Sequence, residues 1–435
     1  MRKLLNEWDR EADGNTLYSI VRDLFPLCRS ITGDGLRESF SYLGKYVDIT
    51  LHEVPSGTRV FDWTVPREWN IRDAYIKNQR GERVVDFRSC NLHVLNYSVP
   101  VYAKMPLAEL KQHIHTLPES PDWVPYRTSY YRDDWGFCMS HRQLSRLPDE
   151  EYEVCIDATL AAGHMTIGEL RIQGRTNSEV IISAHSCHPS LCNDNLSGMA
   201  VATLLAQRLA RLPLRYSYRF LWMPGTIGAI AWLALNESVV PRIKHGLVLS
   251  CLGDPGKFSY KRSRRGDSEI DQAVENLLFH SGREYQIFDF SPYGYDERQF
   301  CSPGFNLPVG CFMRTPNGRY PEYHTSADNL DFVTRDSLSE SLRHLLEVVF
   351  ILENNSRYLN LNPKCEPQLG RRGLYEQVGG KTQPRREEAM LWILNLSDGE
   401  HSLLDIAQRS GMPFPDLFSA AELLEEHRLL KKLEQ

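Results

Sequence analysis

The sequence predicts an α/β protein built on a mixed, mainly parallel sheet flanked by helices, with a small β-rich insert and a helical C-terminal module. Three observations support this fold class. Strand-like and helical segments alternate between Tyr152 and about Asn355, which is typical of a sheet covered by helices. Short β-like runs fill residues 54–148, and three helical segments follow a Gly/Pro/Arg-rich linker near the end of the chain.

The chain begins with two predicted helices within residues 16–50. The segments "TLYSIVRDLFPLC" and "GLRESFSYLGKYV" carry apolar residues at helical spacing. The pattern then changes to β-like runs, "TRVFDWTV", "ERVVDF" and "NLHVLNYSV", which Pro, Gly and Asn interrupt. We therefore predict a separate β-rich insert over residues 54–148.

The alternating region follows the insert. The strand-like runs "EVIISAH", "YRFLWMP", "HGLVLSCLG" and "LPVGCFMR" are each followed by a helical segment, the last of them "SLSESLRHLLEVVFILEN". Sheets of this kind bind ligands at the carboxyl ends of their parallel strands. We expect one α/β catalytic domain from residues 1–53 and 149–362, which the insert divides.

Residues 363–435 form the predicted C-terminal module. The segments "REEAMLWILNLSDG", "SLLDIAQRSG" and "PFPDLFSAAELLEEHRLLKK" have the lengths of a helix-turn-helix or winged-helix module. The segment in the position of a recognition helix carries few cations and four carboxylates, those of Asp416, Glu422, Glu425 and Glu426. Phosphates would repel such a face, so we expect a packing or partner-binding role and no DNA binding.

Composition narrows the function classes. The 435 residues have a formal net charge of -6, which argues against a general nucleic-acid binder. The ten cysteines include no CxxC pair, and "MRKLLNEWDR" lacks the apolar core of a signal peptide. No apolar run is long enough to span a bilayer. We expect a cytoplasmic protein without membrane contact. The composition is consistent with either a monomer or a homo-oligomer.

The stretch "SAHSCHPSLCNDNLSG" contains the first candidate site. Two histidines, two cysteines and a carboxylate follow a buried strand-like run, at the carboxyl edge of the predicted sheet. Taken singly, Asp194 is more typical of a helix N-cap, and His185 or His188 of a hydrogen-bonded loop residue. Zinc thiolates at Cys187 and Cys192 are disfavoured, because no second Cys/His pair lies at zinc-finger spacing.

A second cluster, "RYPEYHTSADNLDFV", changes this interpretation. It places His324 and Glu322 after the last strand-like run, and a parallel sheet can bring that loop beside the first one. Two imidazoles and one carboxylate from two strand-end loops form the ligand set of a hydrolytic zinc ion, with a fourth position left for water. The sequence thus predicts a zinc site at this edge.

These motifs also resemble a known superfamily. "DNLSG" after a strand-end histidine, with a later "HTSADN", is similar to the zinc aminopeptidase/carboxypeptidase superfamily, which includes bacterial leucyl aminopeptidases. Nearly the whole chain resembles one family in it, the aminopeptidase-like-domain proteins, often encoded near polysaccharide or natural-product genes. The motifs of this resemblance are "LCRSITGDGLRES", "VPSGTRVFDWTVPREWNIRDAYI", "YRTSYYRDDWGFC", "CHPSLCNDNLSG", "YGYDERQF", "LPVGCFMRTPNG" and "EYHTSADNLDF". The resemblance implies a zinc-peptidase fold with a β-rich insert and a winged-helix tail.

The resemblance assigns the metal ligands residue by residue. The "CHPS" histidine falls on His188, the "DN" aspartate on Asp194 and the "YHTS" histidine on His324. In the two-zinc aminopeptidases the strand-end histidine would fall on His185, which we keep as the alternative ligand.

The sequence departs from the two-zinc pattern. Pro224 and Gly225 stand where those enzymes carry a Glu-Glu pair, and Ser250 falls where a further aspartate is expected, although Asp254 lies nearby. These loops offer too few anionic ligands for two zinc ions. We expect a single zinc ion per chain in a His-Asp-His site.

A carboxylate that activates water is needed beside such a zinc ion. Glu322 and Glu297 are the candidates for this general base, and each could instead be a loop carboxylate paired with Arg298 or Arg314. Those arginines could also hold a substrate carboxylate in a bidentate contact.

The insert carries a dense cluster of aromatic and basic residues. They are Trp123, Tyr126, Arg127, Tyr130, Tyr131 and Trp135. Such residues could form the insert's own core. We predict instead that the insert covers the zinc site and narrows it to small or end-on substrates, with Arg127 and Tyr130 as substrate-binding residues.

The predicted function is a zinc-dependent hydrolase of amide or peptide bonds that acts on small peptides or aminoacyl conjugates. Two alternatives stay open. The missing Glu-Glu pair is also consistent with a degenerate peptidase domain retained as a binding or scaffold module. A zinc enzyme of cyclisation or acyl transfer is the other, because glutaminyl cyclases share the superfamily fold.

Overall fold

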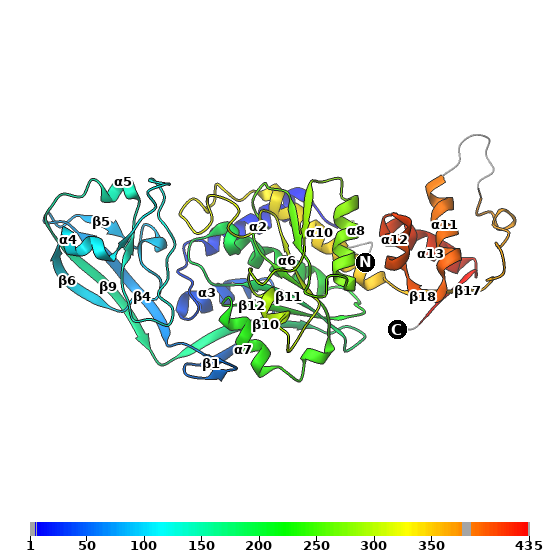
Figure 1. Ribbon diagram of the computed structural model, residues 1–435, viewed down its shortest axis with the longest axis horizontal. Helices are drawn as coiled ribbons and strands as arrows, with labels where there is room; N and C mark the ends of the chain where they lie inside the picture. Colours follow the sequence, from blue (N-terminus) through cyan, green and yellow to red (C-terminus); the bar gives the residue numbers. More distant parts are fainter. Residues whose placement is uncertain (1–4, 6, 376–383, 434–435) are drawn as a thin grey trace.

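Three units follow one another along the long axis of the molecule in the computed structural model, which describes residues 5, 7–375 and 384–433 (Figure 1). The α/β unit lies in the middle, with the β-rich insert at one end and the helical tail at the other. A mixed eight-stranded sheet runs through the α/β unit. The predicted fold class is confirmed.

The central sheet has the strand order β1-β10-β12-β11-β13-β16-β14-β15. Its four middle strands run parallel to one another, whereas β10 is antiparallel to both of its neighbours and β14 is antiparallel to β16. Every residue of β11 and β12 is buried, as expected for strands covered on both faces. The strands are β1 (Thr50–Pro55), β10 (His164–Ile172), β11 (Glu179–His185), β12 (Ser217–Met223), β13 (Ile243–Leu249), β14 (Phe258–Lys261), β15 (Tyr285–Phe288) and β16 (Val309–Met313).

Helices cover both faces of this sheet. One face packs against α2, α3, α6, α8 and α10 around a continuous apolar core, and the other packs against α7 and α9. The helix α2 begins earlier than predicted because Asp9 caps it, accepting hydrogen bonds from the backbone of Glu11 and Ala12. The helices are α2 (Arg10–Leu24), α3 (Asp34–Leu43), α6 (Gly198–Leu209), α7 (Ile227–Leu235), α8 (Glu269–His280), α9 (Glu297–Phe300) and α10 (Arg335–Asn354).

The insert is built on a four-stranded antiparallel sheet, β5-β4-β9-β6. Its long strands β4 (Glu68–Lys77) and β9 (Glu151–Ala161) pair along almost their whole length. The insert's sheet therefore continues past residue 148, where we expected the insert to end. The remaining elements are β2 (Arg59–Val60), β3 (Trp63–Thr64), β5 (Arg83–Asp86), β6 (Val101–Pro106), β7 (Ile114–His115), β8 (Phe137–Cys138), α4 (Leu107–Leu110) and α5 (His141–Leu144).

One predicted strand of the insert is absent. The run at residues 91–99 forms a single 3-10 turn, Asn91–His93, and then only isolated bridges through Val94 and Asn96. Its apolar residues are buried nevertheless, so the pattern reported burial correctly but not the backbone conformation.

The described part of the tail contains three α-helices and a three-stranded sheet, β18-β17-β19. Its first strand precedes residue 363, where we expected the module to begin, and residues 376–383 of the expected linker lie outside the described residues. The tail docks on the α/β unit through Phe350 of α10, whose ring contacts the rings of Phe414 and Phe418. The elements are β17 (Arg357–Asn360), α11 (Pro384–Leu396), β18 (Asp398–Ser402), α12 (Leu403–Ser410), α13 (Phe414–Glu426) and β19 (Leu430–Lys432). Among the described helices, none combines the length and apolarity needed to cross a membrane.

Candidate metal centre

The predicted metal ligands meet at the carboxyl edge of the central sheet. His185 is the last residue of β11, and His188 follows in the next loop. Asp194 lies at a kink within the π-helical segment Cys192–Ser197, directly before α6, and its own backbone is not helical. His324 reaches the same edge from the loop between β16 and α10. The first three side chains are buried and that of His324 is 34% exposed, so the cluster meets solvent on the His324 side.

Asp194 is the centre of this cluster. Its Oδ1 lies 2.8 Å from Nε2 of His185, and its Oδ2 lies 3.0 Å from Nε2 of His324. Nε2 of His188 is 3.9 Å from the same Oδ2. Ligand atoms of His185, His188 and Asp194 all lie within 4.8 Å of one another. The structure thus brings together all four predicted ligands, including both alternatives, His185 and His188.

The electrostatics of the cluster suit a bound cation. Burial lowers the pKa of His188 well below its usual value, so its imidazole is neutral and offers a lone pair. Burial alone would raise the pKa of Asp194, but His185 and His188 hold it well below its usual value. Within the described part of the chain, Nε2 of His185 and Oδ1 of Asp194 are buried without a partner in hydrogen-bonding geometry. A zinc ion fits this donor set, because it would satisfy both atoms.

Asp328 ties the two ligand-bearing loops together, a role that the sequence analysis missed. Its carboxylate accepts hydrogen bonds from the backbone N–H groups of Asn193 at 2.6 Å and Asp194 at 3.0 Å. Burial raises the pKa of Asp328 to about 8. Asp328 follows His324 by four residues, so these bonds hold the Asp194 loop against the His324 loop. The "HTSADN" motif contains this aspartate, but a single sequence does not show what it bonds.

Two further buried residues hold His188 in place. Sγ of Cys187 lies 3.2 Å from Nδ1 of His188. The guanidinium of Arg29, which is fully buried, donates a 2.9 Å hydrogen bond to the carbonyl oxygen of His188. Because Nδ1 and the backbone are both engaged, Nε2 is the ring nitrogen left to face Asp194.

The loop after β12 supplies no carboxylate to the cluster. The ring centroid of Tyr295 lies 3.9 Å from that of His185. A Cβ atom at Gly225 would lie 1.8 Å from Cε1 of this tyrosine, so a glutamate at that position would displace the ring. The tyrosine therefore occupies space beside His185 that the Glu-Glu pair of a two-zinc site would need.

The residues near the other missing ligand are also engaged elsewhere. Ser250 donates a 3.1 Å hydrogen bond to Oδ1 of Asn317. Asp254 accepts hydrogen bonds from the amide of Asn193 at 3.1 Å and from the hydroxyl of Thr315 at 2.5 Å. Asp254 thus links the loop that carries Asp194 to the loop that follows β16.

The insert contacts the metal cluster directly. The backbone N–H of Tyr126 donates a 2.8 Å hydrogen bond to the carbonyl oxygen of His324, next to an antiparallel bridge between Pro125 and Thr325. The ring centroid of Tyr126 lies 4.8 Å from that of His188 and 5.2 Å from that of His324. The insert therefore lies over the histidines on the solvent side of the cluster.

The two predicted substrate-binding residues of the insert differ in position. The hydroxyl oxygen of Tyr130 lies 2.9 Å from that of Tyr126, so Tyr130 supports the ring that contacts the histidines. Arg127 is exposed, and its side chain forms no ion pair with the described residues.

The two candidate bases are in different environments. Glu322 is half-buried, two residues before His324, and its carboxylate has no hydrogen bond or ion pair to the part of the chain that the structure describes. Glu297 is buried, forms an ion pair with Lys261, and accepts a 3.0 Å hydrogen bond from the backbone N–H of Tyr295. Of the two, only Glu322 keeps a carboxylate available to a substrate or a water molecule.

Asp296, beside Glu297, is a buried carboxyl group whose two oxygens have no hydrogen-bond partner among the described residues. Burial raises its pKa well above the usual value, so the folded state holds this proton more tightly than the unfolded chain does. The resulting stability is present at low pH and is lost as the pH rises from the unfolded pKa towards the folded one, by up to about 1.4 kcal/mol per pH unit.

Asp296→Asn is therefore expected to raise the melting temperature at pH 8 and to flatten its dependence on pH. Melting curves between pH 4 and pH 9 test this, with the exposed Asp267→Asn as the control. A variant that melts lower than the wild type at pH 8, with the same pH dependence, contradicts the prediction.

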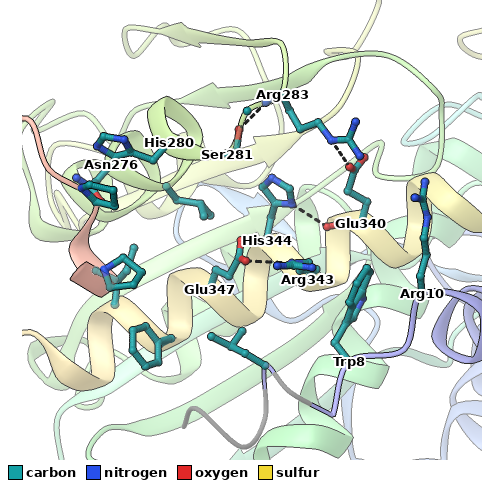
Figure 2. A pocket seen from close by; sticks show the side chains of 17 residues that line it. Trp8, Arg10, Asn276, His280, Ser281, Arg283, Glu340, Arg343, His344 and Glu347 are labelled. Atoms are coloured by element: carbon teal, nitrogen blue, oxygen red, sulfur yellow. Dashed lines mark hydrogen bonds and ion pairs between the residues drawn. The ribbon is translucent and has the colours of Figure 1, made fainter. Parts of the chain in front are cut away.

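Neither of the two predicted substrate-binding arginines places an unpaired guanidinium at the metal cluster. Arg298 is exposed on α9. Arg314 is buried, donates a hydrogen bond of 3.2 Å to the carbonyl oxygen of Gly256, and pairs with Glu340 at 3.1 Å. Glu340 also pairs with Arg283 at 2.6 Å, at the rim of a separate cavity of about 700 Å³ between α8 and α10 (Figure 2). The Arg314 guanidinium is thus already occupied.

Comparison with known proteins identifies the family. Residues 18–355 match the family described as "Domain of unknown function (DUF4910)". The chain belongs to the DUF4910 family. Residues 356–432 match a family described as winged helix-turn-helix, so the winged-helix tail is confirmed and begins beside β17.

This DUF4910 protein has close relatives in Clostridium acetobutylicum. It is 52% identical over 419 residues, 96% of each chain, to a protein named "Putative polysaccharide biosynthesis protein with aminopeptidase-like domain". A crystal structure of a "putative peptidase" from the same organism superposes with a TM-score of 0.95 at 50% identity, covering 99% of both chains. The predicted aminopeptidase-like domain is therefore confirmed.

More distant structures share the fold of the DUF4910 protein. A zinc aminopeptidase from Bacillus subtilis superposes with a TM-score of 0.57 at 14% identity, covering 80% of this chain and 96% of that one. An aminopeptidase from Aneurinibacillus sp. strain AM-1 gives 0.52 at 13% identity, covering 80% and 95%. At these identities the similarity shows the fold alone.

Proposed function

We propose that this protein is a zinc-dependent hydrolase of amide or peptide bonds that acts on small peptides or aminoacyl conjugates. The observation that carries the proposal is the convergence of three imidazoles on one buried carboxylate, Asp194, at the ligand-binding edge of the sheet. Nε2 of His185 and Oδ1 of Asp194 are buried and face each other at 2.8 Å outside hydrogen-bonding geometry, and a bound cation would satisfy both atoms.

The ligands we assign to one zinc ion are Asp194, His188 and His324, with His185 as the alternative to His188, so that one position stays open for water. Bound there, zinc would polarise the scissile carbonyl and lower the pKa of a water molecule to about 7. Glu322 would accept the proton of that water and pass it to the leaving amine.

Two features favour a single ion over a pair. The ring of Tyr295 leaves no room for a carboxylate at Gly225, and Asp254 is already bound to Asn193 and Thr315. Asp194 is then the single carboxylate among the close-set ligand atoms found in the described residues. One carboxylate with imidazole ligands suits one hydrolytic zinc ion.

The insert supports the restriction to small substrates. Tyr126 lies against both His188 and His324, and the insert backbone pairs with the backbone beside His324. A folded polypeptide substrate would have to pass this contact before one of its internal peptide bonds could reach Asp194. A dipeptide or an aminoacyl conjugate can approach with one end only.

Metal analysis combined with a substrate panel tests the proposed function. The full chain, purified without added metal, is assayed for zinc and then for turnover of aminoacyl anilides, dipeptides and blocked peptides. We expect about one zinc per chain and hydrolysis of the short substrates. Zinc without turnover of any member would instead indicate a binding module, and release of a cyclic or transferred product would indicate acyl chemistry.

We also propose that the tail packs against the α/β unit and does not bind DNA. Its α13 packs against Phe350 of α10, and carboxylates outnumber cations along that helix. Fluorescence anisotropy with random duplex DNA at about 150 mM salt should show no submicromolar binding by the full chain. Submicromolar, salt-sensitive binding would contradict this prediction.

The cysteines support a reducing compartment, and we propose the cytoplasm. All ten are free thiols, and most of them are buried. Proteins in oxidising compartments commonly carry disulfides instead.

A further inference from the structure

A cavity of about 450 Å³ lies at the same sheet edge as the metal cluster. Two loops form its walls, residues 288–294 and residues 316–319. The first loop continues into Tyr295, whose ring packs on His185. The second continues to His324, five residues after Arg319. Both walls of the cavity are thus covalently continuous with the surroundings of the cluster.

The strand register gives the position of the cavity relative to the cluster. Ser183 of β11 pairs with Val248 of β13, which pairs with Cys311 of β16, so these side chains share one face. His185 lies two residues beyond Ser183 on β11, and Met313 lies two residues beyond Cys311 on β16. Both therefore point to that same face at the carboxyl end of the parallel strands. Cys311 and Met313 line the cavity. Two strand spacings, about 10 Å, separate these strands, which one substrate can span.

The acidic groups of the cavity already have cationic partners. Glu297 forms its ion pair with Lys261, whose ammonium group also donates to the carbonyl oxygen of Tyr293 at 2.8 Å. Asp289, which is exposed, pairs at 2.6 Å with Arg262, and Arg262 also pairs with Glu275. The ammonium group of Lys261 is thus occupied.

Arg319 carries the unmatched charge of the cavity. Its exposed guanidinium lines the cavity and lies 4.8 Å from the ring centroid of Phe288. It forms no ion pair with any residue in the described ranges. An exposed guanidinium without an ion-pair partner can bind a carboxylate with two parallel hydrogen bonds.

The remaining walls suit the apolar stem of a side chain. Phe288, Met313 and Pro316 line the cavity together with Arg319. A short aliphatic stem that ends in a carboxylate would contact these apolar walls and reach the guanidinium.

We propose that this cavity holds a substrate side chain that ends in a carboxylate, and that Arg319 selects it. The substrates are then acidic aminoacyl compounds, with a glutamyl group as the simplest member. This inference rests on the proposed hydrolase and names its substrate class. It gives to Arg319 the role that the sequence analysis considered for Arg298 and Arg314: Arg298 does not line the cavity, and Arg314 is paired with Glu340.

The first experiment compares glutamyl and glutaminyl substrates, which have nearly the same shape and differ in charge. Zinc-loaded full-length protein is assayed with glutamyl, glutaminyl, leucyl and lysyl anilides. We expect kcat/KM to favour glutamyl over glutaminyl by at least about tenfold, as one charge-assisted contact implies. Arg319→Gln should remove this ratio, because kcat/KM for the glutamyl substrate falls to the level of the glutaminyl one. Arg72→Gln, at an exposed ion pair on the insert, should keep the wild-type ratio.

A binding measurement separates this inference from the proposed function. Calorimetric titration with N-acetylglutamate and N-acetylglutamine uses no turnover, so it reports on the cavity even if no substrate is cleaved. If the protein binds N-acetylglutamate selectively and Arg319→Gln abolishes this binding, the result supports the proposed acidic-side-chain site. This holds whether or not hydrolysis is seen. Turnover without a preference for acidic substrates, or a preference that survives Arg319→Gln, would contradict the role proposed for the cavity. Either result would still be consistent with the proposed hydrolase function.

Discussion

Asp194→Asn is expected to reduce bound zinc from about one equivalent per chain to less than about a tenth, and to abolish hydrolysis. The substitution keeps the shape of the side chain but removes the negative charge on which three imidazoles converge. His324→Ala should have the same effect, because it removes the proposed zinc ligand whose Nε2 lies next to Oδ2 of Asp194. Elemental analysis of protein purified without added metal measures the loss.

The folded state should survive both substitutions. His324 is partly exposed, and the loop that carries it stays tied to the Asp194 loop through Asp328. Circular dichroism and melting curves of each variant provide the control, with Glu322→Gln as a matched variant that should keep its zinc. Two zinc ions per wild-type chain, or full zinc content in Asp194→Asn, would refute the single-ion site.

Glu322→Gln is expected to lower kcat by about 10²- to 10⁴-fold while zinc content and melting temperature stay unchanged. The amide cannot accept the proton of the water molecule, yet it has the same size as the carboxylate. Glu322 is suited to this role because its carboxylate has no partner among the described residues and its loop carries His324.

Glu297→Gln serves as the comparison variant. Glu297 pairs with the buried Lys261, so its replacement should lower the melting temperature more than it lowers kcat per folded, zinc-bound molecule. A Glu322→Gln enzyme with wild-type kcat, or a Glu297→Gln enzyme that is stable but inactive, would transfer the role of base to Glu297.

Strands and helices with a clear hydrophobic period were predictable. The segment "EVIISAH" is β11 with the expected bounds, and the helical period after it corresponds to α6. The four-residue strands β14 and β15 were missed, because segments so short carry too few residues to establish a period. The long β9 was assigned to the wrong side of the insert boundary, because a strand's pattern does not show which sheet it joins.

The candidate ligands were predictable for a different reason. Histidines and aspartates in the loops that follow parallel strands are expected near one sheet edge, so their position along the sequence limits where they can be. The residues that complete the site were not predictable in this way. Asp328 acts through backbone N–H groups, and Tyr126 comes from an insert far away in the sequence.

The sequence by itself determined the α/β fold class, the winged-helix tail and the convergence of His185, His188, Asp194 and His324, since these follow from local periodicity and strand-end position. Only the tertiary structure decided which charges are available for chemistry. Glu297 and Arg314 are paired with Lys261 and Glu340, whereas Glu322 and Arg319 form no ion pair with the residues that the structure describes. The physical reason is that an ion pair depends on distances of a few ångströms between side chains from different elements, and neither spacing nor composition along one chain specifies those distances.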